Sequence, residues 1–138
     1  MPFLTTDEEI RNVLKSSKTV AVIGISPEPH KPSYFVTEVV KSYGFKIYLV
    51  NPKYEGQIIL GEKVYKSILD IPDGIDIIDV FRRPADVGYT AEEAIKKSFK
   101  TFWFQPQTYN EEVAKMLIEK GFNVVANKCM KVECQRLL

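Results

Sequence analysis

The stretch that most constrains the fold is residues 19–33, Thr-Val-Ala-Val-Ile-Gly-Ile-Ser-Pro-Glu-Pro-His-Lys-Pro-Ser. Its apolar run Thr19–Ile23 ends at Gly24, which is typical of the first strand and glycine turn of a nucleotide-binding α/β unit. A dinucleotide-binding turn would have two more glycines soon afterwards, where this chain has Ser26 and a proline-rich loop. We expect Ser33 to cap a following helix. The two hydroxyls predict a loop that binds phosphate without the Gly-x-Gly-x-x-Gly geometry.

Apolar runs of strand length alternate with segments of helical periodicity along the chain. Strands are predicted at residues 19–24, 46–50, 75–81, 101–104 and 123–126, with a short edge strand and turn around 65–71. Helices are predicted after a capping box at Thr5-x-x-Glu8, from Ser33 to Gly44, from Pro84 with Val87, Ala91, Ala94 and Ile95 on the inner face, and from Asn110 to Gly121; a polar tail follows residue 126.

This alternation predicts an α/β fold. We expect a Rossmann-like, doubly wound parallel sheet with helices on both faces, in a three-layer α/β/α arrangement. A chain of 138 residues is long enough for one domain of this kind, so residues 1–138 are expected to form a single domain.

Composition and charge narrow the classes of partner. The chain is 45% hydrophobic and 27% charged, and its net charge of +1 provides no global field for nucleic acid or an anionic membrane. The acidic N-terminus lacks the apolar core of a signal peptide, and no apolar run approaches the roughly 20 residues of a membrane span. Cys129 and Cys134 lack metal-site spacing. These features favour a cytoplasmic protein that holds no metal.

Polar and basic residues follow four of the predicted strands. They are Gly24, Ile25, Ser26, His30, Lys31 and Ser33 after the first strand, Asn51, Pro52, Lys53 and Tyr54 after the second, Arg82 and Arg83 after the third clear strand, and Gln105 and Pro106 after the next. In a doubly wound sheet, ligands bind outside the carboxyl ends of the strands, so these residues are candidates for one site. Asn51 stands where NAD-binding proteins usually have an acid, and Lys53 suits a phosphorylated ribose, as in NADP or coenzyme A.

The sequence contains no recognisable catalytic constellation. His30 is the sole histidine and has no evident partner, and Asp76 and Asp79 are three residues apart in a strand, so they face opposite sides. Trp103 is expected in the strand core. Cys129 is expected to be a small buried hydrophobe, with reaction of its thiol with a cofactor thiol as the alternative. The residues predict a binding site without catalytic residues.

Several segments together resemble one family. They are Val-Ala-Val-Ile-Gly-Ile-Ser at 20–26, Val-Asn-Pro-Lys-Tyr-Glu-Gly at 50–56, Leu-Gly-Glu-Lys-Val-Tyr at 60–65 and Ile-Asp-Val-Phe-Arg-Arg-Pro at 78–84. These motifs are similar to those of the small stand-alone CoA-binding proteins, whose Rossmann-like domain also forms the N-terminal part of the succinyl-CoA synthetase α subunit. The resemblance covers essentially the whole chain.

The resemblance implies a role in coenzyme A binding for twelve residues of this chain. It places the diphosphate against Gly24, Ile25, Ser26 and Ser33, and the adenosine phosphate end against Asn51, Pro52 and Lys53. It also implies that Val80, Phe81, Arg82 and Arg83 line the cleft, with Gln105 at the neighbouring strand end. A bulky residue at Ser26 or Gly24 is expected to abolish binding while leaving the fold intact, because both lie in a loop after a strand.

Two departures from the family bear on activity. Cys134 stands where the family's C-terminal tail often has a histidine, and we expect no second ligase domain with the synthetase's phosphate-accepting histidine. We therefore predict a protein that binds CoA or an acyl-CoA without catalysis of its own, alone or as a homodimer or with an unknown protein partner. An NADP-dependent oxidoreductase and a non-catalytic partner subunit are the alternatives.

Overall fold

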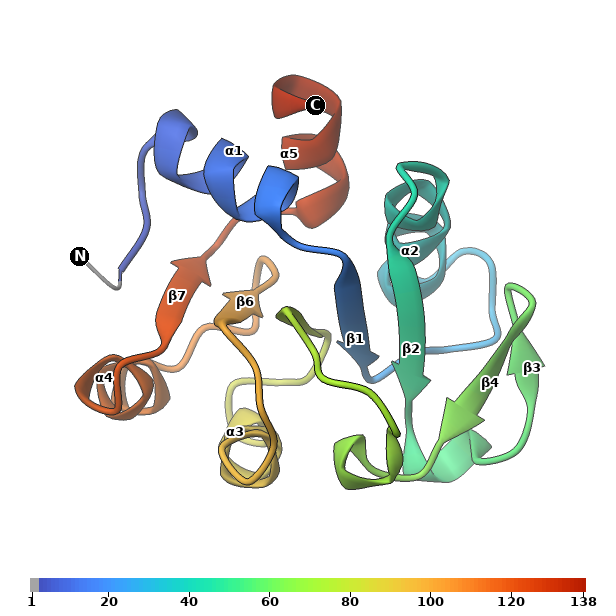
Figure 1. Ribbon diagram of the computed structural model, residues 1–138. Coiled ribbons are helices and arrows are strands. Elements are labelled where there is room, and N and C mark those ends of the chain that lie inside the picture. The colour runs from blue at the N-terminus through green and yellow to red at the C-terminus, as the bar shows by residue number, and fades with distance from the viewer. Residues whose placement is uncertain (1–2) are drawn as a thin grey trace.

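Seven strands form one sheet in the computed structural model, which describes residues 3–138 (Figure 1). The strands are β1 (Thr19–Ile23), β2 (Lys46–Val50), β3 (Ile58–Ile59), β4 (Glu62–Tyr65), β5 (Ile77–Val80), β6 (Thr101–Phe104) and β7 (Asn123–Ala126). Their order across the sheet is β3-β4-β2-β1-β5-β6-β7. Every pairing is parallel except that of β3 with β4.

The chain winds outward from β1 in two directions. Strands β2 and β4 follow on one side of β1, whereas β5, β6 and β7 follow on the other, so the strand order reverses between β1 and β5. Counted along the chain, the parallel strands have the order 3-2-1-4-5-6 of a doubly wound Rossmann sheet. The predicted fold class is therefore confirmed. The carboxyl ends of β1 and β5 form the switch point at which such folds bind ligands.

Helices cover both faces of the sheet (Figure 1). One face carries α1 (Asp7–Ser16), α2 (Pro32–Ser42) and α5 (Met130–Leu137), and the other carries α3 (Val87–Ala94) and α4 (Glu111–Glu119). Successive strand residues face opposite layers, as the two-residue period of a strand requires. In β1, Val20 and Val22 belong to the core beneath α1, α2 and α5, whereas Ala21 and Ile23 belong to the core beneath α3 and α4. The sheet is therefore apolar on both faces.

The first helix begins one residue later than predicted. Thr6 rather than Thr5 is the N-cap of α1: its Oγ1 accepts a hydrogen bond from the Glu9 amide at 3.1 Å, and Glu9 Oε1 accepts one from the Thr6 amide at 3.0 Å. Hydrogen bonds from the Thr6 and Thr5 amides lower the pKa of the Glu9 carboxyl. The run Thr-Thr-Asp-Glu-Glu fits the capping-box pattern in two registers, so the pattern alone could not separate them.

The edge strand and turn predicted around residues 65–71 are only partly confirmed, because the strand β4 ends at Tyr65 and only the turn lies within this segment. The β3–β4 hairpin occupies the sheet edge, and Ile68–Asp70 form a short 3-10 helix. The hairpin turns at Leu60 and Gly61, whose φ angles are 52° and 78°. A two-residue turn with two positive φ angles favours Asn-Gly or Asp-Gly. This turn is Leu-Gly instead, so the usual hairpin pattern is missing at this position.

Two helices also differ from expectation. Helix α3 begins at Val87 rather than at Pro84, and Ile95 is its C-cap, although it packs against the core as predicted. The predicted polar tail is helix α5, whose buried face includes Met130 and Cys134. Its polar residues made this face hard to recognise: Arg136 forms an ion pair with Glu133 of the same helix and another with Asp7 of α1. None of the helices within residues 3–138 is long and apolar enough to cross a membrane.

Candidate ligand-binding site

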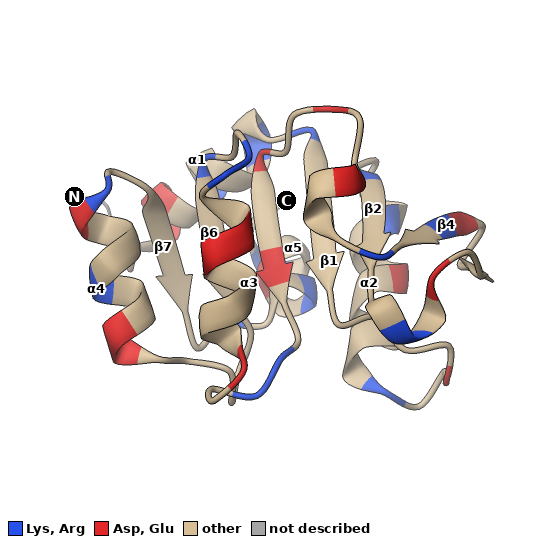
Figure 2. Cartoon of the chain, turned by 90° about the horizontal axis from the view of Figure 1, so that it is seen from below, with Lys and Arg blue, Asp and Glu red and all other residues tan. Residues whose placement is uncertain are grey.

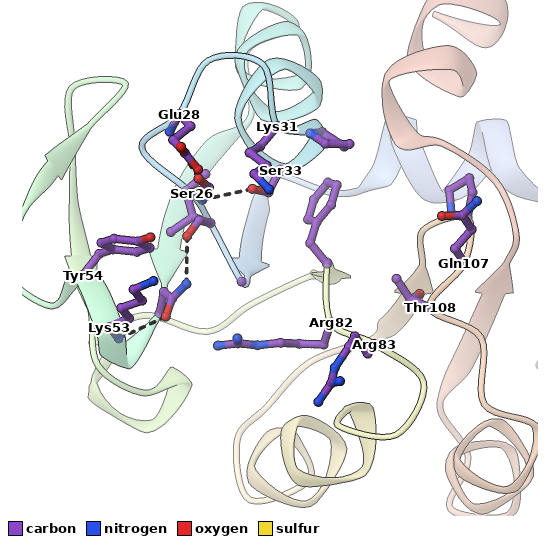
Figure 3. A pocket seen from close by; sticks show the side chains of 16 residues that line it. Ser26, Glu28, Lys31, Ser33, Lys53, Tyr54, Arg82, Arg83, Gln107 and Thr108 are labelled. Atoms are coloured by element: carbon purple, nitrogen blue, oxygen red, sulfur yellow. Dashed lines mark hydrogen bonds between the residues drawn. The ribbon is translucent and has the colours of Figure 1, made fainter.

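A cavity of about 730 Å³ opens at the carboxyl edge of the sheet, beside the switch point between β1 and β5. The loops that follow β1, β2, β5 and β6 form its walls (Figure 3). Its lining residues are Gly24, Ile25, Ser26, Glu28, Lys31, Pro32, Ser33, Asn51, Lys53, Tyr54, Phe81, Arg82, Arg83, Pro106, Gln107 and Thr108. The cavity has the size of a typical small-molecule site.

The backbone of the loop after β1 lies close to the end of β5 at Gly24. Its φ is 95°, and a Cβ at this position would lie 2.5 Å from the carbonyl oxygen of Phe81. Its amide donates a hydrogen bond to the Val50 carbonyl at 2.9 Å. The turn therefore packs against the ends of both neighbouring strands. The added atoms of a bulky residue at Gly24 would displace backbone, so we expect such a variant to lose stability as well as binding.

Two serines close the loop between β1 and α2. Ser33 is not the N-cap of α2; the cap is Lys31, and Pro32 takes the first helical position. Proline has no amide hydrogen to satisfy there, which makes it well suited to that position. Ser33 Oγ instead accepts a hydrogen bond from the Ser26 amide at 2.9 Å, and Ser26 Oγ accepts one from the Glu28 amide at 3.2 Å. Neither hydroxyl donates a hydrogen bond to another residue between 3 and 138.

Asn51 joins two walls of the cavity. Its Nδ2 donates a hydrogen bond to the Ile25 carbonyl at 2.8 Å, and its Oδ1 accepts one from the Lys53 amide at 3.0 Å. The side chain is buried but still lines the cavity, so the contact with the adenosine phosphate end that the resemblance implies stays a prediction. Its place at the end of β2 leaves that strand end without a carboxylate.

Cations outnumber acids in the cavity lining. Lys31, Lys53, Arg82 and Arg83 lie there, with Glu28 as the only carboxylate among the described lining residues (Figure 3). Lys31, Lys53 and Arg82 form no salt bridge with any residue between 3 and 138. Figure 2 shows basic segments in the loops beyond the strand ends. The cavity therefore suits a ligand with negative charge.

The two adjacent arginines diverge (Figure 3). Arg83 Nε donates a hydrogen bond to Asp86 at 2.8 Å, and the Arg83 side chain is 81% exposed. Arg82 lines both the first cavity and a second one of about 500 Å³, on the α3 side of the sheet edge. Pro52 lines only this second cavity, together with the apolar residues Ile23 and Val50. Arg82 therefore lies between the two cavities.

Nine of the twelve residues predicted from the sequence line the first cavity, and three do not. Val80 and Gln105 are buried beside it, and Pro52 lies in the second cavity. Four other lining residues, Glu28, Pro32, Gln107 and Thr108, were not predicted, and Lys31, Tyr54 and Pro106 were predicted only to follow strand ends. All seven lie within three residues of a predicted site residue, so considering whole loops after each strand would have found them.

A buried acid lies beneath the site. Asp79 of β5 accepts a hydrogen bond at its Oδ1 from Gln105 Nε2 at 2.7 Å, whereas its Oδ2 has no partner among residues 3–138. Burial raises the pKa of Asp79 to about 7, and burial also raises the pKa of the nearby Cys134 thiol, to about 12. Asp76 accepts backbone amides at the start of β1, so the two acids do not form a dyad.

The remaining chemical candidates lie outside the cavity. His30 is exposed and Cys129 is half-buried, and neither lines the cavity. Trp103 is fully buried, as predicted, and its Nε1 donates a hydrogen bond to the Lys128 carbonyl at 2.7 Å. Within residues 3–138, no group of three or more His, Cys, Asp or Glu side chains is placed to hold a metal ion.

Comparison with known proteins relates this chain to CoA-binding domains. Residues 18–135 match the family model of the CoA binding domain. Uncharacterized protein YneT of Bacillus subtilis is 38% identical over 124 residues, which are 90% of each chain. The α subunit of an ADP-forming acetate–CoA ligase of Pyrococcus furiosus is 34% identical over 88% of this chain, but the match spans only 24% of that subunit. A hypothetical protein from Pyrococcus horikoshii has a similar structure, with a TM-score of 0.92 and 44% identity over 96% of this chain and 92% of that one.

Proposed function

Because this chain belongs to the CoA-binding domain family, we propose that it binds coenzyme A or an acyl-CoA in the cavity at the switch point. One observation carries the proposal: Lys31, Lys53 and Arg82 line the same cavity and have no acidic partner within residues 3–138. A ligand with several phosphates supplies the opposite charge. CoA carries a diphosphate and a separate 3′-phosphate.

The loop after β1 suits the diphosphate. The hydroxyl protons of Ser26 and Ser33 are free to donate, because both oxygens act only as acceptors within the fold. The loop leads into the N-terminus of α2, where the helix dipole favours negative charge. Gly24 lets the loop approach β5 closely, which brings Arg82 to the same space.

Lys53 suits the 3′-phosphate of the adenosine. It follows β2, where a protein that binds an unphosphorylated ribose would present an acid to the ribose hydroxyls. Asn51 at that point has no charge and is occupied by hydrogen bonds within the fold. The second cavity, with its apolar Ile23 and Val50, offers the neighbouring adenine ring a place to be buried.

We propose binding without turnover by this chain alone. Acyl transfer needs a nucleophile or general base near the thioester. The described lining of the first cavity contributes cations, hydroxyls and amides, with Glu28 as its one acid. The acetate–CoA ligase relative contains this region as a 24% share of its length, so ligase activity is not carried over to this chain.

Calorimetric titration with CoA, acetyl-CoA, NADP⁺ and ADP tests the proposed ligand class. CoA or acetyl-CoA should bind at least about tenfold more tightly than NADP⁺ and ADP, because only they combine the diphosphate, the 3′-phosphate and the pantetheine arm. A Lys120→Ala variant, altered at the far end of α4, should bind like the unaltered protein. Preference for NADP⁺ would favour an oxidoreductase, and failure to bind any of the four would favour a partner-binding subunit.

A further inference from the structure

The turn after β6 holds a glutamine in a conformation that favours glycine. The Gln105 carbonyl accepts a hydrogen bond from the Thr108 amide at 3.1 Å, Pro106 takes the second position, and Gln107 in the third position has a φ of 71°. These are the features of a type II β-turn, whose third position normally holds glycine or asparagine. A glutamine there carries a conformational cost that glycine avoids.

No contact of Gln107 within the described residues offsets the conformational free energy of its positive φ angle. Its side chain is exposed and forms no hydrogen bond with residues 3–138. It does line the cavity, on the opposite side from Lys53 (Figure 3). Backbone strain tends to persist at ligand sites, where the strained residue acts on the ligand. The position of Gln107 therefore points to a role in the bound complex.

Buried contacts beneath the turn keep Gln107 in this conformation. Thr108 Oγ1 donates a hydrogen bond to the Gln105 carbonyl at 2.8 Å, and Gln105 Nε2 donates one to Asp79 Oδ1 at 2.7 Å. Thr108, Gln105 and Asp79 are all buried. The turn is thus fixed to β5 by side chains that cannot shift without losing their partners. Asp79 is a positioning residue, which acts on the cavity through Gln105.

The two sides of the cavity differ in chemistry. Lys53 and Arg82 place charge on one side, whereas the wall formed by residues 106–108 has a proline, an amide and a hydroxyl. CoA has the same asymmetry, with phosphates at the nucleotide end and two amides in the pantetheine arm. A glutamine amide has both a donor and an acceptor, so it can pair with an amide of that arm.

We propose that Gln107 binds the pantetheine arm and determines specificity for CoA over nucleotides that lack this arm. The proposal rests on the proposed function, because it takes CoA as the ligand of the first cavity. The strained turn then places the Gln107 side-chain amide beside the pantetheine arm, which has no charge for Lys53 or Arg82 to bind. This orientation places the nucleotide end of CoA at Lys53 and its pantetheine arm at the loop after β6.

The test compares CoA with adenosine 3′,5′-bisphosphate, which has phosphates on the same ribose but no pantetheine. Calorimetry is performed on the unaltered protein, Gln107→Gly and Gln107→Asn. Both replacements tolerate positive φ, and neither can place an amide at the same reach. Each should bind CoA about fivefold to tenfold more weakly, the effect of one lost hydrogen bond, and bind the bisphosphate as before. Gln107→Gly should also melt at a higher temperature.

The outcomes separate this inference from the proposed function. CoA binding by Gln107→Gly within twofold of the unaltered protein would overturn the role of Gln107 while leaving CoA binding intact. Equal losses of affinity for CoA and the bisphosphate would also overturn it, because the residue would then act on the phosphate site. If the unaltered protein binds neither compound, the proposed function fails and this inference fails with it.

Discussion

Asn51 Nδ2 donates a hydrogen bond of 2.8 Å to the carbonyl oxygen of Ile25, and so joins the loop after β2 to the loop after β1. The Oδ1 atom of the same side chain accepts the Lys53 amide at 3.0 Å. Asn51 is 8% exposed, so these bonds lie in the interior. The side chain therefore sets the spacing between the proposed diphosphate loop and Lys53, and it acts as a positioning residue.

Removing this amide should affect stability and binding together. Asn51→Ala leaves the buried Ile25 carbonyl without its partner, which should lower the free energy of unfolding by about 1–3 kcal/mol. CoA affinity should also fall, because the two loops are no longer held in register. Urea unfolding and calorimetry on the same preparations measure the two effects. Weakened binding with unchanged stability would instead make Asn51 a direct ligand contact.

Gly24 and Gly44 form a matched pair for backbone strain. Their φ angles are 95° and 97°, but a Cβ at Gly24 would meet the Phe81 carbonyl, whereas nothing lies within 4 Å of a Cβ at Gly44. Gly44→Ala should cost about 1–2 kcal/mol, from the left-handed conformation alone. Gly24→Ala should cost clearly more, because backbone must move. Chemical denaturation measures the free energy of unfolding of both variants. Equal losses of stability would mean that the backbone around Gly24 can move at little cost.

The two arginines after β5 should contribute unequally to binding. Arg82 lines both cavities and has no salt bridge within residues 3–138, whereas Arg83 pairs with Asp86 and is 81% exposed. Arg83 also precedes Pro84, which biases it towards an extended conformation. Arg82→Ala should weaken CoA binding about tenfold or more, and Arg83→Ala by less than about threefold. Identical large losses would contradict the geometry of this loop.

Asp79 should make stability fall as the pH rises. Its pKa in the folded protein is about 7, above the ordinary value of 3.8, because burial penalises the carboxylate. The folded state therefore binds the proton more tightly, and the contribution to stability is complete below about pH 4. It is lost between about pH 4 and pH 7, at up to about 1.4 kcal/mol per pH unit.

Asp79→Asn isolates this titration. Asparagine keeps an oxygen to accept the Gln105 hydrogen bond and cannot ionise. The free energy of unfolding of the variant, relative to that of the unaltered protein, should rise between pH 5 and pH 7 and then level off. Urea denaturation at several pH values gives both curves. Parallel curves would show that Asp79 is ionised in the folded protein throughout this range.

Elements could be predicted from the sequence where a single physical requirement, such as burial or helix capping, demands a particular residue pattern. Buried strands such as Thr19–Ile23 and the Asn110 cap of α4 could be predicted because burial and capping each demand particular residue types. The hairpin at Leu60 could not, because a tertiary contact supports its unusual turn: Lys41 Nζ donates a hydrogen bond to the Leu60 carbonyl at 2.6 Å. Helix α5 was missed because its polar Glu133 is buried against Arg136.

The candidate site, like the fold, could be predicted only in part. The rule that ligands bind at strand ends located all four loops, because it depends only on the order of strands and helices. Which side chain of a loop faces the cavity depends on local turn geometry. Gln105 is turned into the core by Asp79 while Gln107 lines the cavity, and no residue pattern distinguishes the two glutamines. Ser33 likewise resembles a cap in the sequence but serves as an acceptor for Ser26.

We propose that CoA bound in the first cavity has its 3′-phosphate at Lys53. The most direct measurement is calorimetry of CoA and dephospho-CoA against the unaltered protein, Lys53→Ala and Lys63→Ala. The two lysines are matched, because each lies over a neighbouring tyrosine ring, at 5.3 Å and 5.2 Å from its centroid, but only Lys53 lines the cavity.

A charged hydrogen bond contributes about 1.5–3 kcal/mol, so the unaltered protein and Lys63→Ala should prefer CoA over dephospho-CoA by about tenfold to a hundredfold. Lys53→Ala should lose this preference. Equal affinity of the unaltered protein for CoA and dephospho-CoA, or an undiminished preference in Lys53→Ala, would contradict the account.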